Sequence, residues 1–235
     1  LILASPLVAP DLFPWGVQAL FLLAGFELRL ADRRWSLRGG LGGWISHIRM
    51  TPQRLIPWTA AAVVATIAGD GALALAILIA ATLCELLAYP MVAHLLGRLP
   101  RRTVAVMLLA LVATASLTHA DTARHMLTFM SGIAACLIWL RGPDGEPREL
   151  AMAMAGLAAS MLTPIFVPAA MPFAFLAGLI CATWALAHLS VWRRSPVPWR
   201  NEAIQKGFVG MRRTIWPPHP SSMRTTASPA SHDAR

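Results

Sequence analysis

The fold class of this chain is decided by one stretch, GALALAILIAATLCELLAYPMVAHLL, which occupies residues 71–96. Apart from Glu85 and His94, the stretch contains no charged or histidine side chain. A helix of its length is about 39 Å long, which is enough to cross the roughly 30 Å hydrocarbon core of a bilayer. The stretch therefore predicts a transmembrane helix with one carboxyl group, that of Glu85, near its middle.

The composition extends this prediction to the whole chain. Its 235 residues are 57% hydrophobic and only 13% charged, which is too little polar surface to cover a soluble globular protein of this size. We therefore expect an all-α fold, a polytopic transmembrane helical bundle. Apolar runs predict about seven spans, at residues 12–30, 55–69, 71–96, 103–118, 125–140, 150–166 and 169–192.

The basic residues predict the orientation of these spans. Nineteen of the 20 Lys and Arg residues fall in alternate loops or in the C-terminal tail, and Arg124 is the exception. By the positive-inside rule the N-terminus lies outside and the C-terminus inside, with three successive helical hairpins after the first span. This distribution accounts for the net charge of +9 without nucleic acid. It predicts contacts of the Arg-rich loops and tail with anionic lipids.

We expect three regions along the chain: a transmembrane domain over residues 1–192, a basic juxtamembrane segment over 193–216 and a disordered cytoplasmic tail over 217–235. The tail is rich in Pro, Ser and Thr, which disfavours a packed core. Residues 31–54, between the first two spans, are expected to lie on the membrane surface. Together these features predict a multi-pass protein of a bacterial-type inner membrane.

Glu85 is the first candidate functional residue. An ionised carboxylate in the middle of a span is costly unless it is protonated, paired or hydrated. On an ideal helix Thr82, Glu85 and Tyr89 share one face, which predicts a proton or substrate site made of these three residues. The alternative is a neutral, hydrogen-bonded acid that only fixes helix packing. His94 falls on the opposite face of a straight helix and is expected at the membrane interface.

A second group of polar residues, His119, Asp121, Arg124 and His125, lies at an expected outer turn. Imidazole and carboxylate groups so close in sequence could bind a transition metal or the edge of a haem, with His94 as a further candidate. The positive charge of Arg124 opposes a divalent cation there. In the alternative interpretation Asp121 caps the following helix and the histidines contact lipid headgroups.

Strips of small residues predict where helices pack closely in the membrane. One strip lies in the fifth span and a longer one in the sixth. Their members are Thr128, Gly132 and Cys136, and then Ala151, Ala155 and Ala159 beside Gly156 and Ser160.

No motif indicates an enzyme: the chain has no Walker A, HExxH, GxSxG or DDxxD sequence, and its single lysine, Lys206, lies outside the spans, which excludes retinal. Our first hypothesis is a small transporter or channel-like protein, or the membrane subunit of a larger complex, that uses Glu85. The second is a redox protein that handles haem, copper or another metal through His119 and His125. The third is a structural or assembly subunit. The sequence itself requires no cofactor, and other membrane subunits are possible partners.

Overall fold

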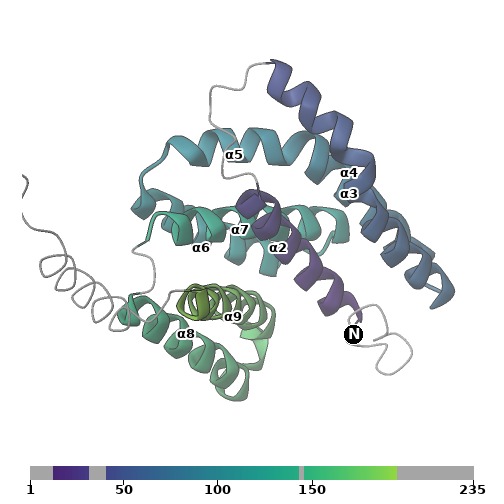
Figure 1. Ribbon diagram of the computed structural model, residues 1–235. Helices are drawn as coiled ribbons and strands as arrows, with labels where there is room; N and C mark the ends of the chain where they lie inside the picture. Colours follow the sequence, from purple (N-terminus) through teal and green to yellow (C-terminus); the bar gives the residue numbers. More distant parts are fainter. Residues whose placement is uncertain (1–12, 32–40, 143–145, 195–235) are drawn as a thin grey trace, which may run out of the picture. The chain divides into compact units, whose positions relative to one another are not determined.

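The computed structural model describes residues 13–31, 41–142 and 146–194. These residues form helices joined by short connections, and no strand occurs among them, so the expected all-α class is confirmed for this part of the chain. In order (Figure 1), the elements are α2 (Phe13–Ala31), α3 (Leu41–Ile67), α4 (Gly71–Leu83), the π-helical turn η3 (Cys84–Ala88), α5 (Tyr89–Arg98), α6 (Arg101–Leu117), α7 (Asp121–Leu140), α8 (Pro147–Phe166), the 3-10 turn η4 (Pro168–Ala170) and α9 (Met171–Arg194).

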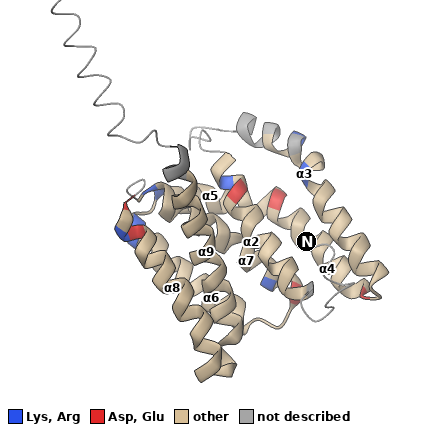
Figure 2. Cartoon of the chain, turned by 60° about the horizontal axis from the view of Figure 1, so that its bottom comes forward, with Lys and Arg blue, Asp and Glu red and all other residues tan. Residues whose placement is uncertain are grey.

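Four helical segments among the described residues are long and apolar enough to cross a membrane, which supports a membrane protein. They are Gly71–Arg98, Asp121–Leu140, Pro147–Phe166 and Pro168–Ser190. Figure 2 shows long stretches of helix without charge, with charged residues mostly toward the helix ends. The remaining expected spans coincide with α2, α3 and α6. That these also cross the bilayer, and with which topology, stays a prediction.

Helix α3 is longer than expected. The sequence predicts a surface segment over residues 31–54 and a span that begins at residue 55, but α3 begins at Leu41 and continues through Pro52 and Pro57 to Ile67. A proline inside a helix removes one N–H donor, and the neighbouring turns can keep the helix continuous. His47, Thr51 and Arg54 are therefore helical residues, and α3 packs against α4 and η3.

The core is built around α7, in which every residue from Ser131 to Trp139 is buried. Helix α2 approaches it so closely that a Cβ atom on Gly132 would lie 2.0 Å from the carbonyl oxygen of Leu22, and one on Gly25 would lie 2.2 Å from that of Phe129. Only glycine permits such an approach of two backbones. The strip of small residues predicted in the fifth span is thus a packing surface.

The longer strip on α8 behaves differently. Gly156 and Ser160 face α9, where their neighbours are Cys181 and Gly178.

The three alanines of that strip are nevertheless exposed, so the expectation that they pack inside the bundle is wrong for this chain. Alanine is small on any helix face, and the helix that lies opposite decides which face packs. The exposed residues are Ala151, Ala155 and Ala159.

Arg141 connects two helix ends. The guanidinium of Arg141 donates hydrogen bonds to the carbonyl oxygens of Leu96, Gly97 and Leu99 at the end of α5. Carbonyls at a helix C-terminus have no partner inside the helix, and a cation there also interacts favourably with the negative end of the helix dipole. Burial, and then the nearby charge of Arg29, lower the pKa of Arg141. Arg141 therefore holds α5 to the end of α7.

The chain divides into two units, residues Leu1–Trp192 and Arg193–Arg235. The basic segment and the tail predicted for residues 193–235 lie outside the described residues from position 195 onward.

Candidate functional site

Glu85 lies on η3 and is only 4% exposed. In a π-helical turn each N–H bonds to the carbonyl five residues earlier, and here the amide of Tyr89 bonds to the carbonyl of Cys84. The next donor in this register would be residue 90, which would bond to the carbonyl of Glu85. Because Pro90 has no N–H, it leaves the carbonyl oxygen of Glu85 available to a partner outside the helix.

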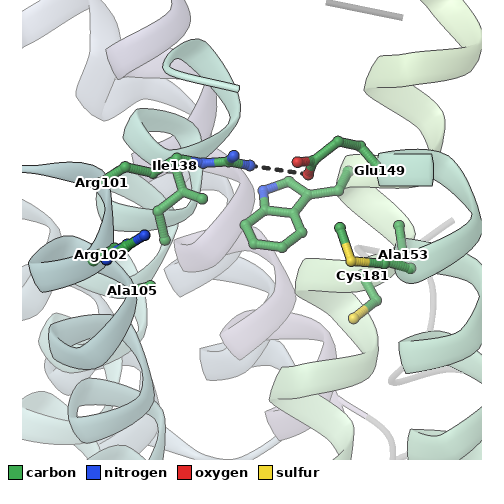
Figure 3. Close-up of a pocket in the computed structure, with 9 residues that line it drawn as sticks. Arg101, Arg102, Ala105, Ile138, Glu149, Ala153 and Cys181 are labelled. Atoms are coloured by element: carbon green, nitrogen blue, oxygen red, sulfur yellow. Dashed lines mark hydrogen bonds and ion pairs between the residues drawn. The ribbon is translucent and has the colours of Figure 1, made fainter. Parts of the chain in front are cut away.

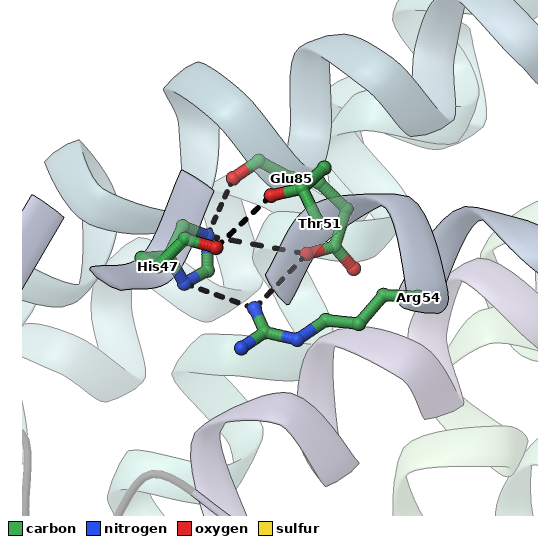
Figure 4. A network of polar contacts seen from close by, with 4 residues as sticks. All are labelled: His47, Thr51, Arg54 and Glu85. Atoms are coloured by element: carbon green, nitrogen blue, oxygen red, sulfur yellow. Dashed lines mark hydrogen bonds and ion pairs between the residues drawn. The ribbon is translucent and has the colours of Figure 1, made fainter. Parts of the chain in front are cut away.

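His47 of α3 is that partner, since its Nε2 atom lies 2.7 Å from the carbonyl oxygen of Glu85 (Figure 4). Its other ring nitrogen, Nδ1, lies 2.9 Å from Nη1 of Arg54. A guanidinium group can only donate, so Nδ1 must accept and Nε2 must carry the hydrogen. We therefore assign His47 as a neutral imidazole that donates to Glu85 and accepts from Arg54.

The same Arg54 nitrogen also pairs with the carboxylate of Glu85, with 3.4 Å between Nη1 and Oε2. Nε2 of His47 lies 4.0 Å from that oxygen. The side chains of His47 and Glu85 are buried, whereas that of Arg54 is 31% exposed. We call these three residues the Glu85–His47–Arg54 cluster. The cluster joins η3 to α3, because the guanidinium group of Arg54 donates to both His47 and Glu85.

Two further residues position His47. Thr51, one turn later on α3, donates a hydrogen bond to the carbonyl oxygen of His47. The ring of Tyr89 stacks on the imidazole, with 5.2 Å between ring centroids and 19° between planes. The imidazole is thus held between the tyrosine ring and its polar contacts.

Both acceptors of Arg54 can bind a proton, which gives the cluster its chemistry. A proton on the Glu85 carboxylate removes the negative charge that Arg54 balances. A proton on Nδ1 of His47 replaces an acceptor by a donor that faces the guanidinium. Either proton would weaken the contact between α3 and η3.

The residues predicted around Glu85 are only partly brought together. Tyr89 is fully buried and belongs to the site through His47. The hydroxyl of Thr82 donates to the carbonyl of Leu78 on its own helix and not to Glu85. His94 is exposed on α5. The polar partners of Glu85 come from α3 and not from its own helix face.

The second predicted group is separated in the structure. His119 is exposed, and Asp121, the first residue of α7, pairs with Arg124. The predicted capping role of Asp121 is wrong, because Ala120 occupies the cap position and no side chain caps this end. His125 is fully buried and stacks on Phe21, with 4.8 Å between ring centroids.

These positions do not suit one metal ion. Among the residues that the structure describes, no three His, Cys, Asp or Glu side chains are grouped so that they could hold one. Neither ring nitrogen of His125 has a hydrogen-bond partner there. The haem or copper hypothesis stays a prediction that no cluster of ligands supports.

Comparison with known proteins adds no assignment. The chain matches no protein family model, no curated protein and no solved structure.

Sequence reasoning missed His47 and Arg54. The positive-inside rule alone accounts for Arg54, and His47 falls in the segment that is expected on the membrane surface. A signal was present, since residues 47, 51 and 54 fall on one face of a helix at spacings of four and three. Pro90, five positions after Glu85, is the second signal, because proline has no backbone N–H to donate to a carbonyl of the preceding turn.

Proposed function

We propose that this protein is a small transport protein of a bacterial inner membrane, which moves protons or a solute coupled to protons through Glu85. The observation that supports the proposal is the ion pair of Glu85, buried in the segment Gly71–Arg98, with Arg54 of a different helix. Ionisable groups inside a span are costly and commonly mark proton or ion pathways. π-Helical turns are also frequent at functional sites.

The proposed mechanism uses the two protonation states of Glu85. As a carboxylate it pairs with Arg54 and holds α3 against η3. As a neutral acid it no longer balances the guanidinium, and the conformation in which α3 has moved away becomes more populated. Alternation between these conformations carries the proton from one side of the membrane to the other.

The test is proton flux into liposomes that contain the purified protein, followed with an enclosed pH-sensitive dye under an imposed membrane potential. We expect the wild-type protein to carry protons faster than protein-free liposomes do, and Glu85→Gln to abolish this difference. Glu27→Gln is the matched control, because Glu27 is exposed on α2, and it should keep the wild-type rate.

Two results would contradict the proposal. One is a wild-type flux no greater than that of protein-free liposomes. The other is a full rate for Glu85→Gln in protein that is correctly folded and inserted. The second result would leave Glu85 as an acid that fixes the packing of α3 on η3.

A further inference from the structure

A cavity of about 380 Å³ lies among α6, α7, α8 and α9, away from the Glu85–His47–Arg54 cluster (Figure 3). Its polar lining is formed by Arg101 and Arg102 at the start of α6 and by Glu149 in the first turn of α8. The rest of the lining is apolar or weakly polar: Ala105, Ile138, Met152, Ala153, Cys181 and Trp184. The cavity thus combines a charged end with an apolar interior.

The charged end favours an anion. Nη2 of Arg101 lies 2.9 Å from Oε2 of Glu149, so this pair is neutral as a unit. Arg102 is exposed and has no ion pair with any residue that the structure describes, which leaves one uncompensated positive charge. Helix α6 starts after Pro100 without a side-chain cap. Its first N–H groups and the positive end of its dipole add to the attraction for an anion.

The apolar interior decides between anions. A free phosphate ion would use only Arg102 and the helix end, and would leave the surface of Ile138, Ala153 and Trp184 without a ligand. An acyl chain can cover that surface. The arginines also lie on the side of the membrane where the positive-inside rule predicts the cytoplasm, which is the leaflet with acidic lipid headgroups.

We propose that this cavity is a binding site for an acidic phospholipid. The phosphate lies at Arg102 and the first turn of α6, and one acyl chain lies along the apolar lining. The ion pair of Arg101 with Glu149 holds α6 and α8 at the entrance. Since basic pockets between transmembrane helices suit acidic headgroups, the lipid fills the space between α6 and the pair α8 and α9.

The test is lipid binding to the purified full-length protein in a neutral detergent, measured by native mass spectrometry with phosphatidylglycerol and with phosphatidylcholine. We expect phosphatidylglycerol to bind several-fold more tightly. Arg102→Gln should weaken its binding about fivefold, the effect of one arginine at a lipid phosphate. Arg98→Gln is the matched control, because Arg98 is exposed on α5 and does not line the cavity, and it should change binding less than twofold.

A second variant, Ala105→Phe, fills part of the apolar lining without a change of charge and should also weaken phosphatidylglycerol binding. Excess inorganic phosphate should not displace the lipid. Unchanged unfolding temperatures show that the variants are folded. Equal binding of the two lipids, equal loss in Arg98→Gln and Arg102→Gln, full displacement by phosphate, or undiminished binding in Ala105→Phe would each overturn the proposal.

Discussion

The Nε2 atom of His47 lies 2.7 Å from the backbone carbonyl oxygen of Glu85. Pro90 cannot donate a hydrogen bond to this oxygen, because proline has no N–H. This contact links a backbone irregularity in one helix to a titratable side chain of another. The same imidazole accepts from Arg54, which also faces the Glu85 carboxylate. The π-helical turn is therefore part of the candidate site.

Replacement of Pro90 tests this link. In Pro90→Ala the new N–H at position 90 can bond to the carbonyl of Glu85 and compete with His47. We expect the helix to become more stable, by up to about 3 kcal/mol, while proton flux decreases. Pro164→Ala in α8 is the control and should leave flux unchanged. A Pro90→Ala protein with normal flux would show that the freed carbonyl has no role in transport.

A double-mutant cycle tests the ion pair of Arg54 with Glu85. Arg54→Met should lower the free energy of unfolding by about 1–3 kcal/mol, because it leaves a buried carboxylate without its partner. The combination Arg54→Met with Glu85→Gln should recover part of this loss, with a coupling energy of about 0.5–3 kcal/mol. Chemical denaturation in detergent measures all four proteins. Additive losses would mean that the two side chains do not interact.

The crossing of α2 and α7 predicts a sharp contrast between two glycines. Gly132→Ala places a Cβ atom 2.0 Å from the carbonyl oxygen of Leu22, so the helices must move apart, at a cost of about 1–3 kcal/mol. Gly71→Ala meets nothing within 4 Å, and it should be neutral or stabilising by up to about 1 kcal/mol. Thermal unfolding compares the two. Equal unfolding temperatures would contradict the close approach.

Arg141 should stabilise the end of α5. Arg141→Met removes the donor to the carbonyls of Leu96, Gly97 and Leu99, and we expect a loss of about 1.5–3 kcal/mol, as for hydrogen bonds to charged groups. Arg148→Met, at an exposed position on α8, is the control and should cost less than about 0.5 kcal/mol. Thermal unfolding and hydrogen exchange in α5 measure the effect. If both variants unfold alike, Arg141 does not cap α5.

Absorption spectroscopy and metal analysis of the purified protein address the haem or copper hypothesis. Because His119 and His94 are exposed and His125 is buried against Phe21, we expect neither a haem band nor stoichiometric copper. Protein expressed with added haem precursor and copper is the appropriate sample. A haem band that is lost in His125→Ala but kept in His119→Ala would instead establish His125 as a ligand.

The apolar runs of the sequence predict the helices well, because a long segment without charge has few other ways to satisfy its backbone in a bilayer. They also single out Glu85. They do not predict its partners, since His47 is 38 positions away and the pairing depends on how α3 docks on η3. The start of α3 at Leu41 could not be read from hydropathy alone, because its first turns mix polar and apolar residues.

The faces used for packing were predicted in one helix and not in another. Gly132 lies on a strip that α2 covers, whereas on α8 only Gly156 and Ser160 face α9 and Ala155 stays exposed. Both strips have the same character in sequence. They differ in where the neighbouring helix lies, and the periodicity of a sequence does not predict that position.

The contact of Gly25 and Gly132 with the opposite backbones has a practical consequence for measuring motion. At these two glycines no side chain separates the helix backbones, so α2 and α7 cannot slide or rotate past each other there without collision. Helices α2 and α7 therefore provide a fixed reference frame within the protein. Spin labels at exposed positions of α2 and α3 would report the movement of α3 relative to that frame.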